Sequence, residues 1–211
     1  MSFRSKVLFG ALAVAISAAA ALPAAPALAQ DQKAQPMRIR GTIDSATPQS
    51  ISIMTRDGAH RTLALTDATR YSAVKAMKLS DIKQGSFIGS AGKPGPNGQI
   101  EALEVVVFPE EARGTGEGHY DWDLLPGSSM TNATVSAVVS GKSGRDLDLS
   151  YKGGSAKLKV PENVPVVTFV PAAAKDLKPG LAVFVMAAPA ADGKLSAARV
   201  MMEKDGVKPP M

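Results

Sequence analysis

The sequence Asp81-Ile82-Lys83-Gln84-Gly85 recurs 95 residues later as Asp176-Leu177-Lys178-Pro179-Gly180. At the same offset, Asn97-Gly98-Gln99-Ile100 aligns with Asp192-Gly193-Lys194-Leu195. Two separate motifs that repeat at one spacing indicate an internal duplication. The chain of 211 residues is therefore predicted to contain two copies of one structural unit.

Nearer the start of each copy the spacing changes, because Thr42-Ile43 matches Thr134-Val135 at an offset of 92. A few residues inserted in the first loop of the second copy account for the difference. Loops tolerate such insertions better than strands do. The drift therefore agrees with duplication followed by divergence.

Each copy has the pattern of five short strands. Apolar and polar residues alternate, so that Leu63 and Leu65, for example, share one face of their strand. Asp57-Gly58 predicts a tight hairpin, because both residues tolerate the positive φ that such turns require. The predicted strands are 38–46, 51–55, 61–66, 85–91 and 99–108 in the first copy, and 133–139, 146–151, 156–160, 181–187 and 194–202 in the second.

A short helix is predicted between the third and fourth strands of each copy, at Lys75–Ile82 and at Pro171–Leu177. Five strands with a helical crossover are typical of the small Greek-key barrel of oligonucleotide/oligosaccharide-binding (OB) type. The predicted fold is therefore mainly β, with two tandem five-stranded OB-like barrels behind a signal peptide. The predicted segments are a signal peptide at 1–29, a disordered N-terminus at 30–37, repeat one at 38–108, a structured linker at 109–130, repeat two at 131–203 and a disordered tail at 204–211.

Several short phrases of the chain point to a known type of protein. Each copy opens with Gly-Thr-Ile or Ala-Thr-Val, continues with the Asp-Ile/Leu-Lys-x-Gly motif and closes with an Asn/Asp-Gly-x-Ile/Leu strand. Between the copies stand the phrases Arg113–His119, Trp122–Leu124 and Met130–Ala133. In these features the chain resembles a bacterial extracytoplasmic family of tandem OB-like repeats, a family of unknown function. The resemblance implies a fold and a compartment, and it implies no catalytic residue.

The N-terminus has the pattern of a secretory signal peptide. Arg4 and Lys6 precede an apolar run from Val7 to Leu22, and Ala27-Leu28-Ala29 supplies a small-x-small cleavage pattern. We expect cleavage near Ala29 and a periplasmic or secreted protein; an uncleaved membrane anchor is the alternative. No later apolar run is long enough for a membrane span.

Composition narrows the possible partners. Without Arg4 and Lys6, 22 basic residues face 19 acidic ones, so the mature chain is only mildly basic. Proteins that bind single-stranded nucleic acid place aromatic residues along a basic groove, and this chain has few aromatic residues. The expected partner is therefore an envelope protein or a glycan, and not nucleic acid. The chain has no Cys, so it forms no disulfides.

The linker is the predicted binding site, because it holds the only Trp of the chain and one of its two His. Aromatic rings beside polar groups are typical of protein contacts and sugar stacking. The alternative is that Trp122 fills a seam between the barrels. Phe108, Phe169 and Phe184 stand in apolar runs and are interpreted as core residues. The candidate binding residues are Arg113, Glu117, His119, Tyr120, Asp121, Trp122 and Asp123.

Catalysis and metal binding are the competing hypotheses. His119 is the best candidate for a general base, with Ser128 or Ser129 nearby, but no complete set of nucleophile, base and orienting residue is visible. His119, Asp121 and Asp123 could bind a metal, although one His and no Cys make a weak ligand set. The protein is therefore predicted not to be an enzyme and to hold no cofactor, with metal binding as the alternative function and a small hydrolase as the second.

Overall fold

The computed structural model describes residues 36–141, 144–190 and 193–209. The predicted signal peptide, 1–29, and residues 30–35 of the predicted N-terminal extension lie outside these residues. All the strands belong to one compact unit, Ala34–Met211. Within the described part of the chain, no helix has the length and apolar character needed to cross a bilayer.

The prediction of a mainly β protein is confirmed. The 3-10 turns are η1 Leu79–Asp81, η2 Pro96–Gly98, η3 Glu110–Ala112 and η4 Ala174–Asp176. The strands are β1 Met37–Ala46, β2 Ser50–Thr55, β3 His60–Ala64, β4 Arg70–Ala76, β5 Phe87–Pro94, β6 Ile100–Val107, β7 Gly118–Trp122, β8 Ser128–Gly141, β9 Gly144–Tyr151, β10 Gly154–Pro161, β11 Val166–Pro171, β12 Ala182–Pro189 and β13 Leu195–Met202.

The prediction of a short helix in each copy is wrong. The segment Lys75–Ile82 holds the end of strand β4 and the turn η1, and Pro171–Leu177 holds the end of β11 and the turn η4. Strand β4 has partners on both edges, β11 and β13, and Val74 within it is fully buried. These pairings satisfy the backbone and outweigh the weak helix preference of an Ala- and Lys-containing segment.

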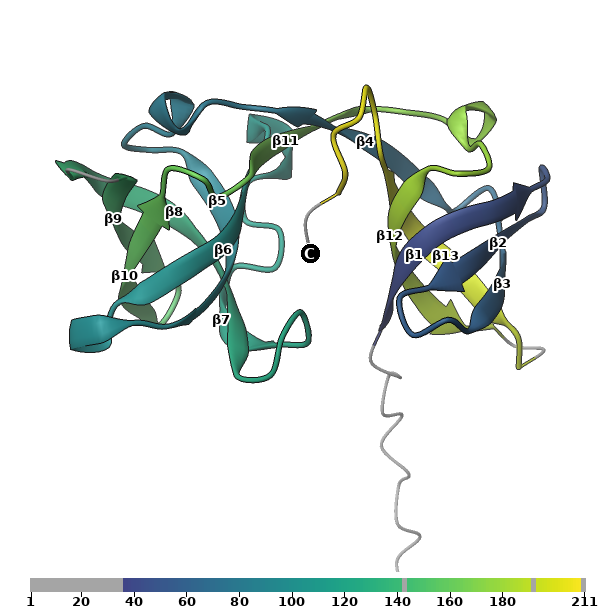
Figure 1. Ribbon diagram of the computed structural model, residues 1–211, viewed down its shortest axis with the longest axis horizontal. Helices are drawn as coiled ribbons and strands as arrows, with labels where there is room; N and C mark the ends of the chain where they lie inside the picture. The colour runs from purple at the N-terminus through teal and green to yellow at the C-terminus, as the bar shows by residue number, and fades with distance from the viewer. Residues whose placement is uncertain (1–35, 142–143, 191–192, 210–211) are drawn as a thin grey trace, which may run out of the picture. The chain divides into compact units, whose positions relative to one another are not determined.

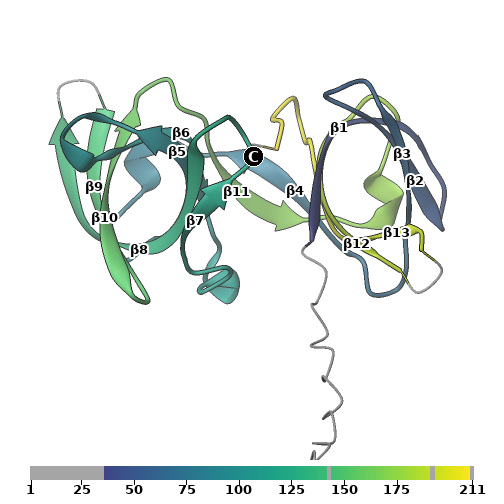
Figure 2. The same cartoon turned by 90° about the horizontal axis from the view of Figure 1, so that it is seen from below.

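The prediction of two separate five-stranded barrels is also wrong, because the strands form one 13-stranded sheet. Its path runs β10-β9-β8-β5-β6-β11-β4-β13-β12-β1-β2-β3, with β7 paired to β8. Two further pairings, β10 with β6 and β13 with β3, close the ends of this path back on themselves. The sheet therefore contains two closed circuits of strands, joined through β4 and β11 (Figures 1 and 2).

Each circuit combines strands from both copies. The first circuit takes β1, β2 and β3 from the first copy but β12 and β13 from the second. The second circuit takes β8, β9 and β10 from the second copy but β5 and β6 from the first. In Figure 1 the purple and blue strands β1–β3 accordingly stand with the yellow-green strands β12 and β13. Neither copy completes a circuit by itself.

The motif that repeats at residues 81 and 176 performs this exchange. The carboxylates of Asp81 and Asp176 accept hydrogen bonds from the backbone N–H three residues earlier, at 3.0 and 2.8 Å, and so close the turns η1 and η4. Gly85 and Gly180 follow with φ of 86° and 88°, a conformation that glycine adopts without strain. Their amides then bond to Val135 O and Ile43 O of the opposite copy, each at 2.8 Å. The motif thus directs each chain segment into the other circuit.

Each circuit has its own apolar core, and both copies contribute to each. Ile51, Ile53 and Leu63 of the first copy pack with Val185 and Val200 of the second, and all five are fully buried. The second core is built in the corresponding way from Ile82, Ile88 and Val105 of the first copy with residues of β8, β9 and β10. A copy without its counterpart would therefore expose apolar surface from half of each core.

A third, smaller cluster lies where the circuits join. Val74, Val106 and Val167 are buried there, and Phe169 and Val207 pack against them. Lys204 and Val207 form an isolated bridge, so the described part of the segment predicted as a disordered tail contains a turn that packs on this cluster.

Candidate ligand cavity beside Trp122

Strand β7 lies within the predicted linker and presents the two aromatic residues of the candidate site. It pairs with the start of β8, with Tyr120 opposite Met130 and Trp122 opposite Ser128. The Ser128 hydroxyl lies 3.0 Å from Trp122 O and 2.7 Å from Leu125 O, both acceptors for it, which holds the turn between the strands. Because side chains alternate along a strand, Tyr120 and Trp122 share one face of β7.

This face of β7 lines a cavity of about 510 Å³, which we call the Trp122 cavity. Its walls come from both circuits and from the linker, and they are rich in aromatic and methionine side chains. The lining residues are Pro36, Arg38, Gly89, Val106, Phe108, Thr115, Gly116, Tyr120, Asp121, Trp122, Met130, Asn132, Phe169, Phe184, Met186, Arg199 and Met201.

One wall is the outward face of β1, β12 and β13. The register places Arg38 beside Met186, and Met186 beside Arg199, in one row across the three strands. Phe184 and Met201 form the next row. The inward residues of these strands fill the core of the first circuit, so this outward face is free to line the cavity.

The opposite wall, on β5, β6 and β8, is closely packed around Gly89. The register aligns Gly89 with both Asn132 and Val106. A Cβ on Gly89 would lie 2.5 Å from Asn132 Oδ1 and 2.9 Å from the Phe108 ring, so this position has no room for a side chain. At the offset of 95 residues, Gly89 corresponds to Phe184 in the facing wall. The glycine therefore lets Asn132 and Phe108 pack closely against the backbone of β5, which a side chain at this position would prevent.

Ion pairs fix one edge of the cavity. The Arg38 guanidinium lies 4.0 Å above the centre of the Trp122 ring and 3.7 Å from the Asp123 carboxylate. Arg40 donates to the same carboxylate at 2.8 Å. Burial by itself would raise the pKa of Asp123, but the hydrogen bond and charge of Arg40, together with Arg38, hold that pKa below its ordinary value. Asp123 therefore stays ionised and anchors both arginines.

Two buried polar atoms of the lining have no hydrogen-bond partner among the described residues: Trp122 Nε1 and Asn132 Oδ1. The Asn132 amide nitrogen, by contrast, donates to Thr115 O at 3.1 Å and to the Tyr120 hydroxyl at 3.3 Å. A buried polar group without a partner costs about 1–3 kcal/mol. Both atoms are covered by protein in this structure, so a ligand meets them only if the lining moves as it binds.

Tyr120 completes the polar part of the lining. Its ring meets that of Trp122 edge to face, with centroids 6.1 Å apart. Burial raises the pKa of the Tyr120 hydroxyl, an effect that the charge of Arg38 partly opposes. The hydroxyl is therefore neutral at ordinary pH, and because it accepts the bond from Asn132, its own hydrogen remains available to a ligand.

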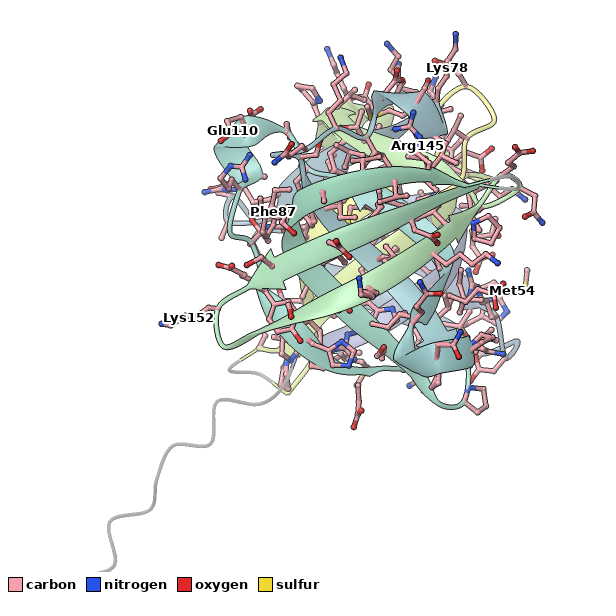
Figure 3. The ribbon with its side chains drawn as sticks, turned by 90° about the vertical axis from the view of Figure 1, so that its left-hand side faces the viewer. Met54, Lys78, Phe87, Glu110, Arg145 and Lys152 are labelled. Carbon is pink, nitrogen blue, oxygen red and sulfur yellow. The ribbon has the colours of Figure 1, made fainter. Side chains whose placement is uncertain are left out.

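Two of the other predicted site residues, His119 and Glu117, lie away from the cavity. His119 points to the opposite face of β7, where Nδ1 lies 2.8 Å from the Thr131 hydroxyl and the ring stacks on Tyr151 at 6.4 Å. Glu117 accepts a hydrogen bond of 3.1 Å from the backbone N–H of Lys152, at the β9–β10 hairpin (Figure 3). Asp121 lines the rim of the cavity and is exposed. Within the part of the chain that the structure describes, no three His, Cys, Asp or Glu side chains gather as metal ligands.

Arg113 also lies away from the Trp122 cavity and holds the linker against the second circuit. It forms an ion pair with Glu110 and donates to Gly85 O at 2.8 Å. Its guanidinium lies 5.9 Å from the centre of the Phe87 ring, and Figure 3 shows Glu110 and Phe87 on the same side of the molecule. These contacts give Arg113 a structural role at the start of the linker.

Four lining residues are not indicated by the sequence as site residues, namely Arg38, Arg199, Asn132 and Met186, and the apolar run around Phe184 indicates a core residue. Phe184 is indeed buried, but on the outward face of its strand, where it contributes to the cavity wall. One signal was present: β12 is apolar on both faces, whereas a strand with one face in water alternates. Such a strand indicates that its outward face is also covered or lines a site.

Comparison with protein-family models, with curated protein sequences and with solved structures finds no match to this chain. The functional interpretation therefore rests on the geometry of the Trp122 cavity.

Proposed function

We propose that the protein is a non-catalytic binding module of the bacterial cell envelope, and that it holds a small ligand with an apolar body in the Trp122 cavity. The cavity itself is the observation that carries this proposal. Its volume of about 510 Å³ falls within the range of about 300–1,000 Å³ that is typical of small-molecule sites. Such sites have mostly apolar walls with a few well-placed polar groups, as this one does.

The composition of the walls favours binding of a flat or chain-like apolar group. Trp122 and Tyr120 offer ring surfaces for stacking, and Met186 offers a flexible thioether side chain that adapts to irregular shapes. Most of the walls are strands rather than loops, so much of the cavity exists before the ligand arrives. A preformed site loses little conformational entropy when it binds.

The polar groups of the cavity support binding rather than catalysis. Its titratable lining residues are Arg38, Arg199, Tyr120 and Asp121. His119, the candidate general base, lies on the other face of β7. A nucleophile and a base within hydrogen-bond reach are needed for acyl or glycosyl transfer, and the described lining offers no such pair.

The envelope location is part of the proposal and rests on the signal-peptide pattern at residues 1–29. Fractionation of cells that express the full chain tests it, together with N-terminal sequencing of the product. We expect a periplasmic or extracellular protein whose sequence starts near Gln30; a cytoplasmic, unprocessed chain would overturn this part.

The binding proposal is tested with the neutral fluorescent probe N-phenyl-1-naphthylamine. Trp122 is the only tryptophan of the chain, so energy transfer from its indole reports binding of the probe, and two variants assign that binding to the cavity. Thr115→Phe places a ring into the cavity from a half-exposed linker position, and Thr62→Phe makes the same change on an exposed position of β3. We expect Thr115→Phe to weaken binding about tenfold or more and Thr62→Phe to leave it unchanged. Equal binding by both variants would refute the proposed site.

A further inference from the structure

We infer that the ligand of the Trp122 cavity is an amphipathic anion, an apolar ring system or chain that ends in one acidic group held between Arg38 and Arg199. This inference rests on the proposed binding function and adds the chemical class of the ligand. It follows from the placement of the two arginines, from the excess of hydrogen-bond donors in the lining, and from the way the two copies differ at this wall.

Arg199 is the first observation. It stands on β13 in the cavity wall and is half-buried. It forms no hydrogen bond or ion pair with any residue that the structure describes, whereas Arg38 and Arg40 share Asp123. A guanidinium that is partly withdrawn from water is stabilised by an acidic partner. The ligand is the available source of that partner.

The two arginines are spaced to hold one acidic group. Arg38 and Arg199 flank Met186 in the same row of the sheet, one strand away on either side. Neighbouring strands lie about 4.8 Å apart, so the two backbone positions are separated by roughly 10 Å. Arg38 is held by Asp123 and the Trp122 ring, so Arg199 is the side chain that extends toward the acidic group above Met186.

The neutral polar groups of the lining also favour an anionic ligand. Trp122 Nε1 is a buried donor without an acceptor, and the Tyr120 hydroxyl has a hydrogen to donate. Against these donors, Asn132 Oδ1 is the one buried acceptor of the described lining without a partner, and Asp121 is an exposed residue at the rim. A lining with more donors than acceptors is complementary to an acceptor-rich group such as a carboxylate or sulfonate.

The pair Arg38 and Arg199 occurs in only one of the two corresponding rows of the sheet. The corresponding row in the other half of the sheet consists of Met130, Ala91 and Glu104, at the offsets of 92 and 95 residues that relate the copies. Arg38 thus corresponds to Met130, and Arg199 to Glu104. Two arginines are therefore not required to build this kind of sheet, which is consistent with a role in recognition.

The test compares two probes that share one ring system. The anion 8-anilinonaphthalene-1-sulfonate differs from neutral N-phenyl-1-naphthylamine by the sulfonate alone. Both are titrated into the purified mature protein and followed by energy transfer from Trp122. We expect the anionic probe to bind at least about tenfold more tightly, which corresponds to about 1.4 kcal/mol.

Arginine variants then show whether the preference for the anionic probe depends on Arg199. Arg199→Met keeps an apolar stem and removes the charge, and we expect it to weaken the anionic probe about tenfold while changing the neutral probe less than twofold. Arg61→Met is the matched control, because Arg61 is an exposed residue of β3, lies outside the row of Arg38 and Arg199, and does not line the cavity. It should change neither probe by more than twofold.

The outcomes separate the two proposals. If the wild-type protein binds both probes equally, or if Arg199→Met weakens both alike, the anionic ligand class is refuted and the binding function stands. If neither probe binds, or if Thr115→Phe affects neither, the proposed function fails and the ligand class fails with it. The comparison of probes on the wild-type protein needs no variant, so it remains decisive even if Arg199→Met folds poorly.

Discussion

Cutting the chain between its two copies should leave the protein intact. A protease site inserted after Gly114, in an exposed part of the linker, would divide the chain into a fragment with β1–β6 and a fragment with β7–β13. Because each circuit contains strands of both fragments, the fragments can separate only if both circuits open. Two barrels that folded independently would instead be held together mainly by the linker.

The strength of this association follows from the side chains that each fragment places in the other's circuit. Full burial of one such side chain contributes about 1.5–3 kcal/mol, which gives roughly 10–20 kcal/mol for the large ones together. The cost of bringing two chains together is about 4–15 kcal/mol, and the shared strand ladders add about 1 kcal/mol for each hydrogen bond. The large exchanged side chains are Val183, Val185, Val200 and Met202 in the first circuit and Ile82, Ile88 and Val105 in the second.

We therefore expect a dissociation constant below about 1 μM, equivalent to more than about 8 kcal/mol. The assay is gel filtration of the cleaved protein without denaturant, with cleavage confirmed on a denaturing gel. The fragments should elute together at the volume of the uncut chain, separate in urea, and fold poorly when expressed singly. Two fragments that elute apart and each keep a folded β spectrum would refute the exchange of strands.

Three further changes test the packing and charges. Val185→Ala should destabilise the protein by about 1–2.5 kcal/mol, because Val185 is fully buried in a shared core, whereas Val139→Ala, at a position that is 56% exposed, should have little effect in the same urea titration. Gly89→Ala should cost about 1–3 kcal/mol by displacing Asn132, and it should also weaken binding of the neutral probe; an unchanged midpoint and affinity would contradict this geometry. The lowered pKa of Asp123 contributes stability above the ordinary aspartate pKa of about 3.9, and this stability is lost as pH falls through the folded value. Asp123→Asn should therefore melt earlier than wild type at pH 6, and the difference should shrink as the pH falls below the ordinary aspartate pKa; a constant difference would contradict the ion pair.

The local structure was predictable because its signals are local. Alternation around Leu63 and the Asp57-Gly58 turn indicated a hairpin, and the structure has one between β2 and β3, with φ of 81° at Gly58. The exchange of strands was not predictable, because Val183 and Val185 satisfy the same alternation whichever copy supplies the neighbouring strand. The sequence repeats the turn motif but does not show in which direction the chain leaves it.

The candidate site was predictable only in part for a related reason. Tyr120 and Trp122 stand out in a short linker, where aromatic residues have little reason to be unless they pack or bind. Arg38 and Arg199 are separated by most of the chain, and only the register through Met186 brings them into one row. His119 adjoins Tyr120 in sequence and was therefore predicted to belong to the site. Alternation along β7 places His119 on the other face of the strand, away from the cavity.

The proposed site for an amphipathic anion has Trp122 in its wall, and the indole N–H signal of this single tryptophan in a nitrogen–proton NMR spectrum reports on binding there. On addition of 8-anilinonaphthalene-1-sulfonate to the wild-type protein, the signal should shift, because a probe bound in the cavity changes the surroundings of the indole. In Thr115→Phe it should shift much less at the same probe concentration. A signal that stays in place at probe concentrations that saturate binding would contradict the account.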